Sequence, residues 1–271
     1  LRGVGGTRDC DWWFTDDAVL IDTAGRYTTQ DSHKEVDASA WQGFLQLLRK
    51  HRRRRPINGA IVAISIQDIL LSTHEQRMQH ARTIRSRLDE LGEQLGLNVP
   101  VYLLFTKCDL LAGFSEFFAD FNHADRNQVW GVTASNSDEL LGRFDSSFAE
   151  LHQRINDRML ERMHQERDLR RRSLIQGFPQ QFGNLQEQLK SFIDQAFAAN
   201  KYSQQPDLRG LYLSSATQQG SPIDRMMSSI SENFALDTAQ LPVQQGQGRS
   251  YFIRNLFNEV IFPEADRVGV N

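Results

Sequence analysis

Residues 20–27, LIDTAGRY, combine residue types that can bind a metal ion and a phosphate. Asp22 follows an apolar run, so its carboxylate lies at the end of an expected strand, where it can hold Mg²⁺ through a water molecule. Gly25 has no side chain to keep a phosphate away from its backbone N–H. We predict Asp22 as a metal ligand and Gly25 as a contact of a terminal phosphate. The alternative is an aspartate that only caps the following turn.

A second group of candidate residues, TKCD at 106–109, directly follows the apolar run 99–105. The Asp109 carboxylate can accept hydrogen bonds from the N1–H and the exocyclic amine of guanine, while the stem of Lys107 covers the ring. Adenine lacks this pair of donors. Thr106, Lys107 and Asp109 are therefore predicted to bind a purine base, with guanine favoured. A loop with a surface lysine and an aspartate cap is the alternative.

The two groups occur in the order and spacing of Ras-like P-loop GTPases, which use GTP with Mg²⁺. We expect the Asp22 turn and the Thr106–Asp109 turn to project from one edge of a single sheet and to face a common crevice. Ser215, Ala216 and Thr217 end a later apolar run, where such proteins place backbone N–H groups against the base. The expected cofactor is GTP or ATP with Mg²⁺.

The phosphate-binding loop GxxxxGK[ST] has no match in the sequence. In the expected order it precedes the first strands and would lie upstream of Leu1, so we expect this chain alone to bind nucleotide poorly and not to hydrolyse it. Thr7 lies where a switch threonine would ligate Mg²⁺. Arg26, in place of a water-positioning glutamine, is the candidate catalytic residue, because it can stabilise phosphate charge although it accepts no proton. An ordinary surface arginine is the alternative.

The composition is that of an ordinary globular protein. The chain has 271 residues and a formal net charge of -3, which gives no general reason to expect nucleic-acid binding. Two cysteines are too few for a disulfide framework and fit a reducing compartment. The longest apolar runs fall short of the roughly 20 residues that a transmembrane helix needs. Without an initiator Met or a signal peptide, the chain is expected to be part of a longer protein.

Apolar periodicity along the chain predicts an α/β fold, with a P-loop GTPase-like, mostly parallel sheet, flanking helices and a helical insert. Two short runs around Thr15-Asp16-Asp17 predict a hairpin. Further strands are expected at 57–66, 99–105, 128–133 and 208–214, and helices at 34–50, 73–95 and 223–234. Residues 137–199 are expected to be helical, with an interruption at 177–179.

These elements suggest a division of the chain. Residues 1–135 and 205–240 would form the GTPase-like domain, 136–204 the insert, and 241–271 a linker followed by an amphipathic segment. Two arginine-rich runs, HRRRR at 51–55 and RDLRRR at 167–172, would suit anionic lipid and an acidic partner respectively. Solvated helix surfaces are the simpler interpretation of both.

Several longer strings resemble the cytoplasmic region of IcmF/TssM proteins, in that family's order and over nearly the whole chain. They are GVGGTRDCDWWFTDDAVLIDTAGRYTTQDS, WQGFLQLLRKHRRRRPINGAIVAIS, VYLLFTKCDLLAGF, RGLYLSSATQQGSPIDR and FIRNLFNEVIFPEA. The resemblance implies a type VI secretion protein of the bacterial inner membrane, with this domain on the cytoplasmic side. It also implies TssL-like and TssJ-like partner subunits, baseplate proteins as docking partners, and self-association of the full-length protein.

Three functional hypotheses remain open at this point. The first is a scaffold that docks the baseplate on a GTPase-like fold. The second is an active GTPase or ATPase that energises assembly of the secretion complex. The third is a fragment of a signal-recognition-type GTPase, which also contains DTAGR and TKxD. The DWWF hairpin and the FIRNLFNEVIFPEA tail argue against the third.

Overall fold

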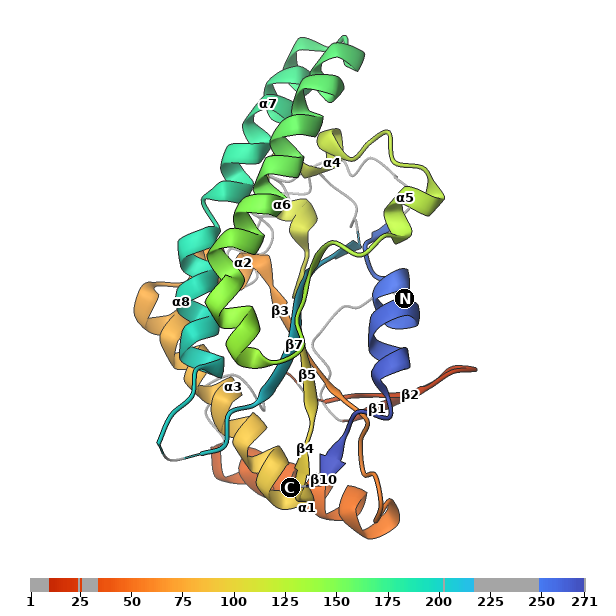
Figure 1. The fold of residues 1–271 in the computed structure, drawn as a ribbon, viewed down its shortest axis with the longest axis vertical. Coiled ribbons are helices and arrows are strands. Elements are labelled where there is room, and N and C mark those ends of the chain that lie inside the picture. Colours follow the sequence, from red (N-terminus) through yellow and green to blue (C-terminus); the bar gives the residue numbers. More distant parts are fainter. Residues whose placement is uncertain (1–9, 24, 26–33, 202, 217–248, 271) are drawn as a thin grey trace, which may run out of the picture.

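The computed structural model describes residues 10–23, 25, 34–201, 203–216 and 249–270 (Figure 1). The helix expected at 223–234 and most of the linker at 242–250 lie outside these residues, as do Thr7, Arg26 and Thr217.

The central sheet has four strands in the order β3-β5-β7-β6. They are β3 (Ala60–Ser65), β5 (Pro100–Thr106), β7 (Asp207–Leu213) and β6 (Gly131–Thr133). The first three are parallel, as the strand–helix–strand pattern predicts, while β6 runs antiparallel to β7 at the edge. The chain is thus a mixed α/β protein with a mostly parallel sheet and flanking helices.

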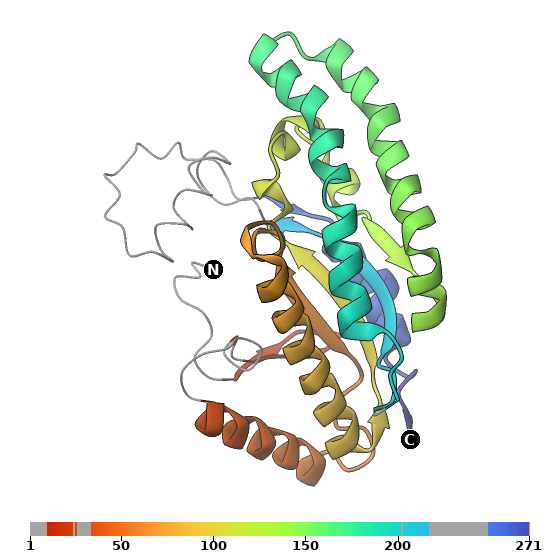
Figure 2. The same cartoon turned by 90° about the vertical axis from the view of Figure 1, so that its left-hand side faces the viewer.

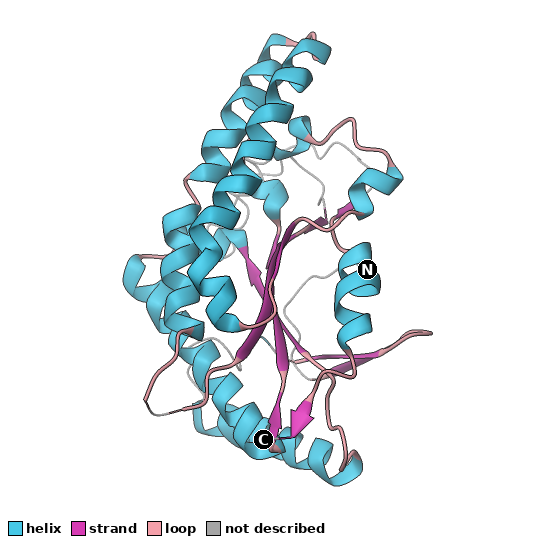
Figure 3. Cartoon of the chain, in the orientation of Figure 1, coloured by secondary structure: helices cyan, strands magenta, loops and turns pink. Residues whose placement is uncertain are grey.

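Long helices cover one face of the sheet (Figures 1 and 3). They are α3 (His74–Leu95), α6 (Ser137–Gln165), α7 (Leu169–Gly183) and α8 (Gln186–Phe197). Alternate residues of β5, Val101, Leu103 and Phe105, belong to the same buried cluster as residues of all four helices. Because side chains alternate across a strand, an apolar run such as β5 must be covered on both sides.

The opposite face is packed by the end of the chain. Tyr102, Leu104 and Tyr212 form a cluster with Leu256, which lies in η3 (Leu256–Ile261). The next turn, η4 (Phe262–Glu264), brings Glu264 to the sheet, where its carboxylate accepts bonds from Arg209 at 2.7 and 3.0 Å and from the Tyr102 hydroxyl at 2.7 Å. The amphipathic segment expected at the end of the chain thus completes the second layer.

The boundaries of the helical region differ from the prediction at one place. The expected interruption at 177–179 is wrong, because Pro179 lies inside α7. Phe178 and Pro179 are buried in the main core, and this burial offsets the hydrogen bond that a proline removes from a helix. The first break falls before α7 instead, where the Asp168 side chain accepts from the N–H groups of Arg170 and Arg171.

Helices α6 and α7 form an antiparallel arm that rises past the sheet in both views (Figures 1 and 2). Its lower part shares the core of the sheet. The arm is also held by the short helix α4 (Phe114–Phe117), since the Arg162 guanidinium donates to the carbonyls of Glu116 and Phe117 at 3.0 and 3.1 Å. Helices α6–α8 therefore have no separate core of their own.

The remaining elements, all short except the 18-residue helix α1, lie around the sheet. They are β1 (Asp11–Phe14), β2 (Val19–Asp22), α1 (Lys34–His51), α2 (Ile66–Leu71), β4 (Leu97–Asn98), η2 (Cys108–Leu110), α5 (His123–Asn127), β8 (Ser215–Ala216), β9 (Ser250–Tyr251) and β10 (Gly269–Val270). The predicted hairpin is present as β1 and β2, which pair with no other strand among the described residues. No helix among the described residues is long and apolar enough to cross a membrane.

Candidate functional site

The loop after β5 carries the predicted base-binding residues and is tied to the loop after β7. The Cys108 N–H donates to the Ser214 carbonyl at 3.1 Å, and the Ser214 N–H donates to the Phe105 carbonyl at 2.8 Å. Lys107 begins the turn with φ of 58°, a left-handed conformation that is uncommon for a residue other than glycine. The loops that follow the parallel strands β5 and β7 are therefore hydrogen-bonded to each other and form one surface.

Asp109 is buried in this surface and accepts a hydrogen bond from the Ser215 hydroxyl. Ser215 and Ala216 form β8, which pairs with Ser250 and Tyr251 of β9. The structure thus brings Thr106, Lys107 and Asp109 together with two of the three residues predicted from the later strand end. The Thr106 hydroxyl also donates to the Ile64 carbonyl at 3.3 Å, which links this loop to β3.

Two ionisable residues, Asp68 near Lys107 and His80 near Asp68, were not predicted from the sequence. Loss of hydration raises the pKa of Asp68 in α2, although the positive charges of His80 and Lys107 act in the opposite direction. Burial lowers the pKa of His80 in α3, against the charge of Asp68. No motif joins these residues, because α2 and α3 bring them together only in the folded chain.

Burial also determines the pKa of Cys108, the cysteine within the TKCD turn. It raises the pKa of the Cys108 thiol well above its usual range. The Sγ atom faces the Phe105 carbonyl at 3.6 Å inside the core. This residue therefore fills space beneath the loop and presents no thiolate to a ligand.

The other predicted site residues lie elsewhere. Ile21, next to Asp22, packs against the cluster that contains Trp41, Leu97 and Val99. Val99 directly precedes β5, whereas Thr106 ends that strand about 23 Å away at the usual rise per residue. The views agree, with the hairpin beside the lower part of the sheet and the loop after β5 in its upper part (Figures 1 and 2).

The common crevice expected for the Asp22 turn and the Thr106–Asp109 turn is therefore not formed by the described residues. The physical reason is the pairing of the strands. β2 has β1 as its only partner, and β3 pairs only with β5, so no described strand joins the hairpin to the sheet. Gly25 lies beyond β2, and Thr7, Arg26 and Thr217 are outside the described residues. The roles predicted for these residues stay predictions.

A nucleotide fits this arrangement only in part. The base-binding candidates are joined, but the Asp109 carboxylate is covered and bonded to Ser215. On the phosphate side, the described residues contain no group of three or more His, Cys, Asp or Glu side chains placed to hold a metal ion. We therefore derive no step of hydrolysis from this geometry.

Comparison with known proteins identifies a family and a relative. The family model described as the IcmF-related N-terminal domain matches residues 34–271. The type VI secretion system component TssM1 of Pseudomonas aeruginosa is 54% identical over 276 aligned residues, which cover 100% of this chain. The chain spans 25% of the length of that relative. No solved structure matches the chain.

Proposed function

Because this chain belongs to the IcmF-related family, we propose that it is part of a type VI secretion system component and serves there as a docking domain. The likeness to TssM1 over the full length of the chain supports the assignment to secretion. We further propose that it lies on the cytoplasmic side of the bacterial inner membrane and contacts baseplate proteins. TssL-like and TssJ-like subunits are the proposed partners of the full-length protein.

The observation that carries the docking proposal is the exposed tip of the arm. Leu160 and Leu169 there are 61% and 78% exposed, although leucine is a core residue in most proteins. The arginines at 167 and 170–172 flank Leu169 in the sequence and outnumber the acidic residues Glu166 and Asp168, which leaves the tip more basic than the chain as a whole. An apolar centre with a charged rim is the usual anatomy of a protein interface, and this one suits an acidic partner.

The test replaces both exposed leucines with serine in the full-length protein. We expect type VI secretion to fall by roughly tenfold or more, because burial of two leucines in an interface contributes several kcal/mol. The control is Leu47→Ser on α1, which is 58% exposed and distant from the arm. Unchanged secretion by the double variant, with normal protein levels, would refute the proposal. Deletion of residues 137–199 is a poorer test, because Phe148, Phe182 and Phe192 are core residues.

Nucleotide binding is the second candidate function, favoured by the joined Thr106–Asp109 and Ser215–Ala216 loops. In the proposal, the base contacts Asp109, and the phosphate side is supplied by sequence upstream of the hairpin. Binding of a fluorescent guanine nucleotide by an N-terminally extended protein, compared with this chain, tests this idea. Asp109→Asn should abolish binding by the extended protein. GTP or ATP turnover by this chain alone, abolished by Asp22→Ala, would overturn the expectation that it is inactive.

A further inference from the structure

The outer edge of β6 carries backbone groups that pair with no strand in the described part of the chain. The Leu213 N–H donates to the Trp130 carbonyl at 2.8 Å, and the Ala134 N–H donates to the Arg209 carbonyl at 2.8 Å. Antiparallel pairing alternates, so the N–H and C=O groups of Gly131 and Thr133 point away from β7. Within the described part of the chain, β7 is the only strand that pairs with β6. Such an edge is a template for another strand.

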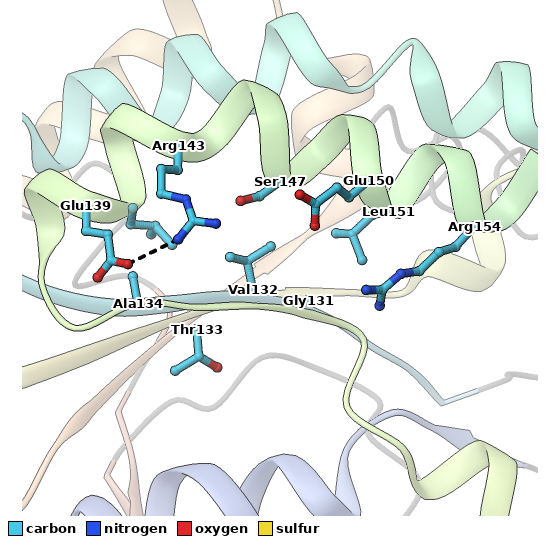
Figure 4. Close-up of a pocket in the computed structure, with 11 residues that line it drawn as sticks. Gly131, Val132, Thr133, Ala134, Glu139, Arg143, Ser147, Glu150, Leu151 and Arg154 are labelled. Carbon is cyan, nitrogen blue, oxygen red and sulfur yellow. Dashed lines mark hydrogen bonds and ion pairs between the residues drawn. The ribbon is translucent and has the colours of Figure 1, made fainter.

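A stripe of polar side chains on α6 overhangs this edge (Figure 4). Arg143, Ser147, Glu150 and Arg154 point from the helix into a cleft of about 160 Å³ that is bounded below by β6. Arg143 is paired with Glu139 at 3.3 Å. Glu150 and Arg154 make no hydrogen bond or ion pair with any described residue.

The spacing of Glu150 and Arg154 along the helix matches the spacing of side chains on one face of an added strand. Residues four apart on a helix are about 6 Å apart along its axis. Residues two apart on one face of a strand are about 6.6 Å apart. A strand laid along β6 would therefore place two consecutive side chains of one face beneath Glu150 and Arg154.

We propose that the edge of β6 binds an extended peptide of a partner protein as a fifth strand. The peptide carries a basic residue opposite Glu150 and an acidic residue opposite Arg154, two positions apart. Main-chain bonds to Gly131 and Thr133 supply affinity, and the two charges select the sequence. A second copy of this chain is a poor occupant, because its own β6 offers only Gly-Val-Thr. This site is separate from the arm tip and from the loop after β5.

The test uses four short synthetic peptides of alternating threonine and valine, labelled with a fluorophore. At two positions separated by one residue they carry Lys and Asp, Asp and Lys, two Lys, or two Asp. Fluorescence anisotropy with the 271-residue chain should show one mixed-charge peptide binding roughly tenfold more tightly than either like-charged peptide, since like charges in apposition oppose binding. N-methylation of those peptide amides that face β6 should weaken binding of the preferred peptide by a similar factor, because each methyl group removes a main-chain hydrogen-bond donor.

Two variants separate the charge effect from a general loss of structure. Arg154→Glu should reverse the preference, so that the peptide with two lysines binds best. Arg170→Glu, at the arm tip, should leave all four affinities unchanged. Equal affinities for the four peptides, no binding of any, indifference to N-methylation, or self-association of the chain through β6 would overturn the proposal.

Discussion

Removing the carboxylate of Glu264 tests how the end of the chain is held to the sheet. The side chain of Arg209 is only 5% exposed, and that of Glu264 is 21% exposed. In Glu264→Ala, the Arg209 guanidinium loses its two bonds to the carboxylate, and the Tyr102 hydroxyl loses its acceptor. The Nη1 atom of Arg209 is already buried without a hydrogen-bond partner, so the variant leaves a buried cation that keeps no hydrogen-bonded carboxylate and only the electrostatic attraction of Asp207.

The expected loss of stability follows from that buried charge. Breaking a buried ion pair by removing one partner costs about 3–5 kcal/mol. Because water reaches part of Glu264, we expect the lower end, about 3 kcal/mol. With a urea m-value of about 3 kcal/mol per molar, the unfolding midpoint should fall by about 1 M.

A double variant provides the decisive control. Replacing Arg209 and Glu264 together by methionine removes the buried cation as well as its partner, and such replacements are often neutral. The double variant should therefore be more stable than Glu264→Ala. Urea unfolding followed by circular dichroism measures both. A double variant less stable than the single one, or a single variant within about 0.5 kcal/mol of the parent, would refute the reasoning.

The same pair predicts a dependence on pH. Burial alone would raise the pKa of Glu264, but hydrogen bonds from Arg209 and Tyr102 outweigh it and lower the pKa below the ordinary value. A lowered folded-state pKa stabilises the protein above the unfolded value of about 4.3, and this contribution is lost as the pH falls through the folded value. The stability difference between the parent and Glu264→Ala should therefore be constant at neutral pH and shrink in acid.

Three further outcomes are expected. Gly113→Ala should lower the thermal midpoint by several degrees, because φ is +88° and a Cβ would lie 2.2 Å from the Leu174 carbonyl oxygen; an unchanged midpoint would contradict the close approach of α4 to α7. The pKa of His80 is lowered by burial despite the charge of Asp68, so stability should fall as the pH drops below about 6.5, and urea midpoints should show a smaller fall in His80→Gln. Cys108 should resist a thiol reagent until the chain unfolds, as a time course with and without urea would show; rapid labelling of both cysteines in the native protein would disagree with its burial.

The sheet and its covering helices were predictable because their signals are local. The run PVYLLFT must be buried on both sides, and helical periodicity flanks it, so a parallel sheet follows. Helix α3 begins at a capping box on Thr73 and ends at Gly96, whose φ is 66°. Both ends can be predicted from the residues next to them in the sequence. The hydrogen-bonded loops after β5 and β7 follow from the same reasoning, since parallel strands end at one edge.

Features that depend on distant contacts were not predictable. Pro179 reads as a helix breaker, and only the burial of its neighbourhood keeps α7 continuous. The three residues of β6 are too few to reveal their antiparallel direction, which is fixed by pairing with β7. No sequence motif predicts that Asp68 and His80 lie close together. The expected crevice assumed that the hairpin joins the sheet, and sequence periodicity reports strands without reporting their partners.

The continuity between the arm and the sheet has a mechanical consequence. Phe182 of α7 stacks on Phe148 of α6 at 4.8 Å between ring centroids, and Phe192 of α8 meets Phe105 of β5 edge-on at 6.5 Å. Close-packed aromatic rings have few alternative arrangements, so the lower arm cannot swing without disrupting them. A force applied at the tip would therefore be transmitted through these two ring pairs to the sheet, so that the arm and the sheet tilt together.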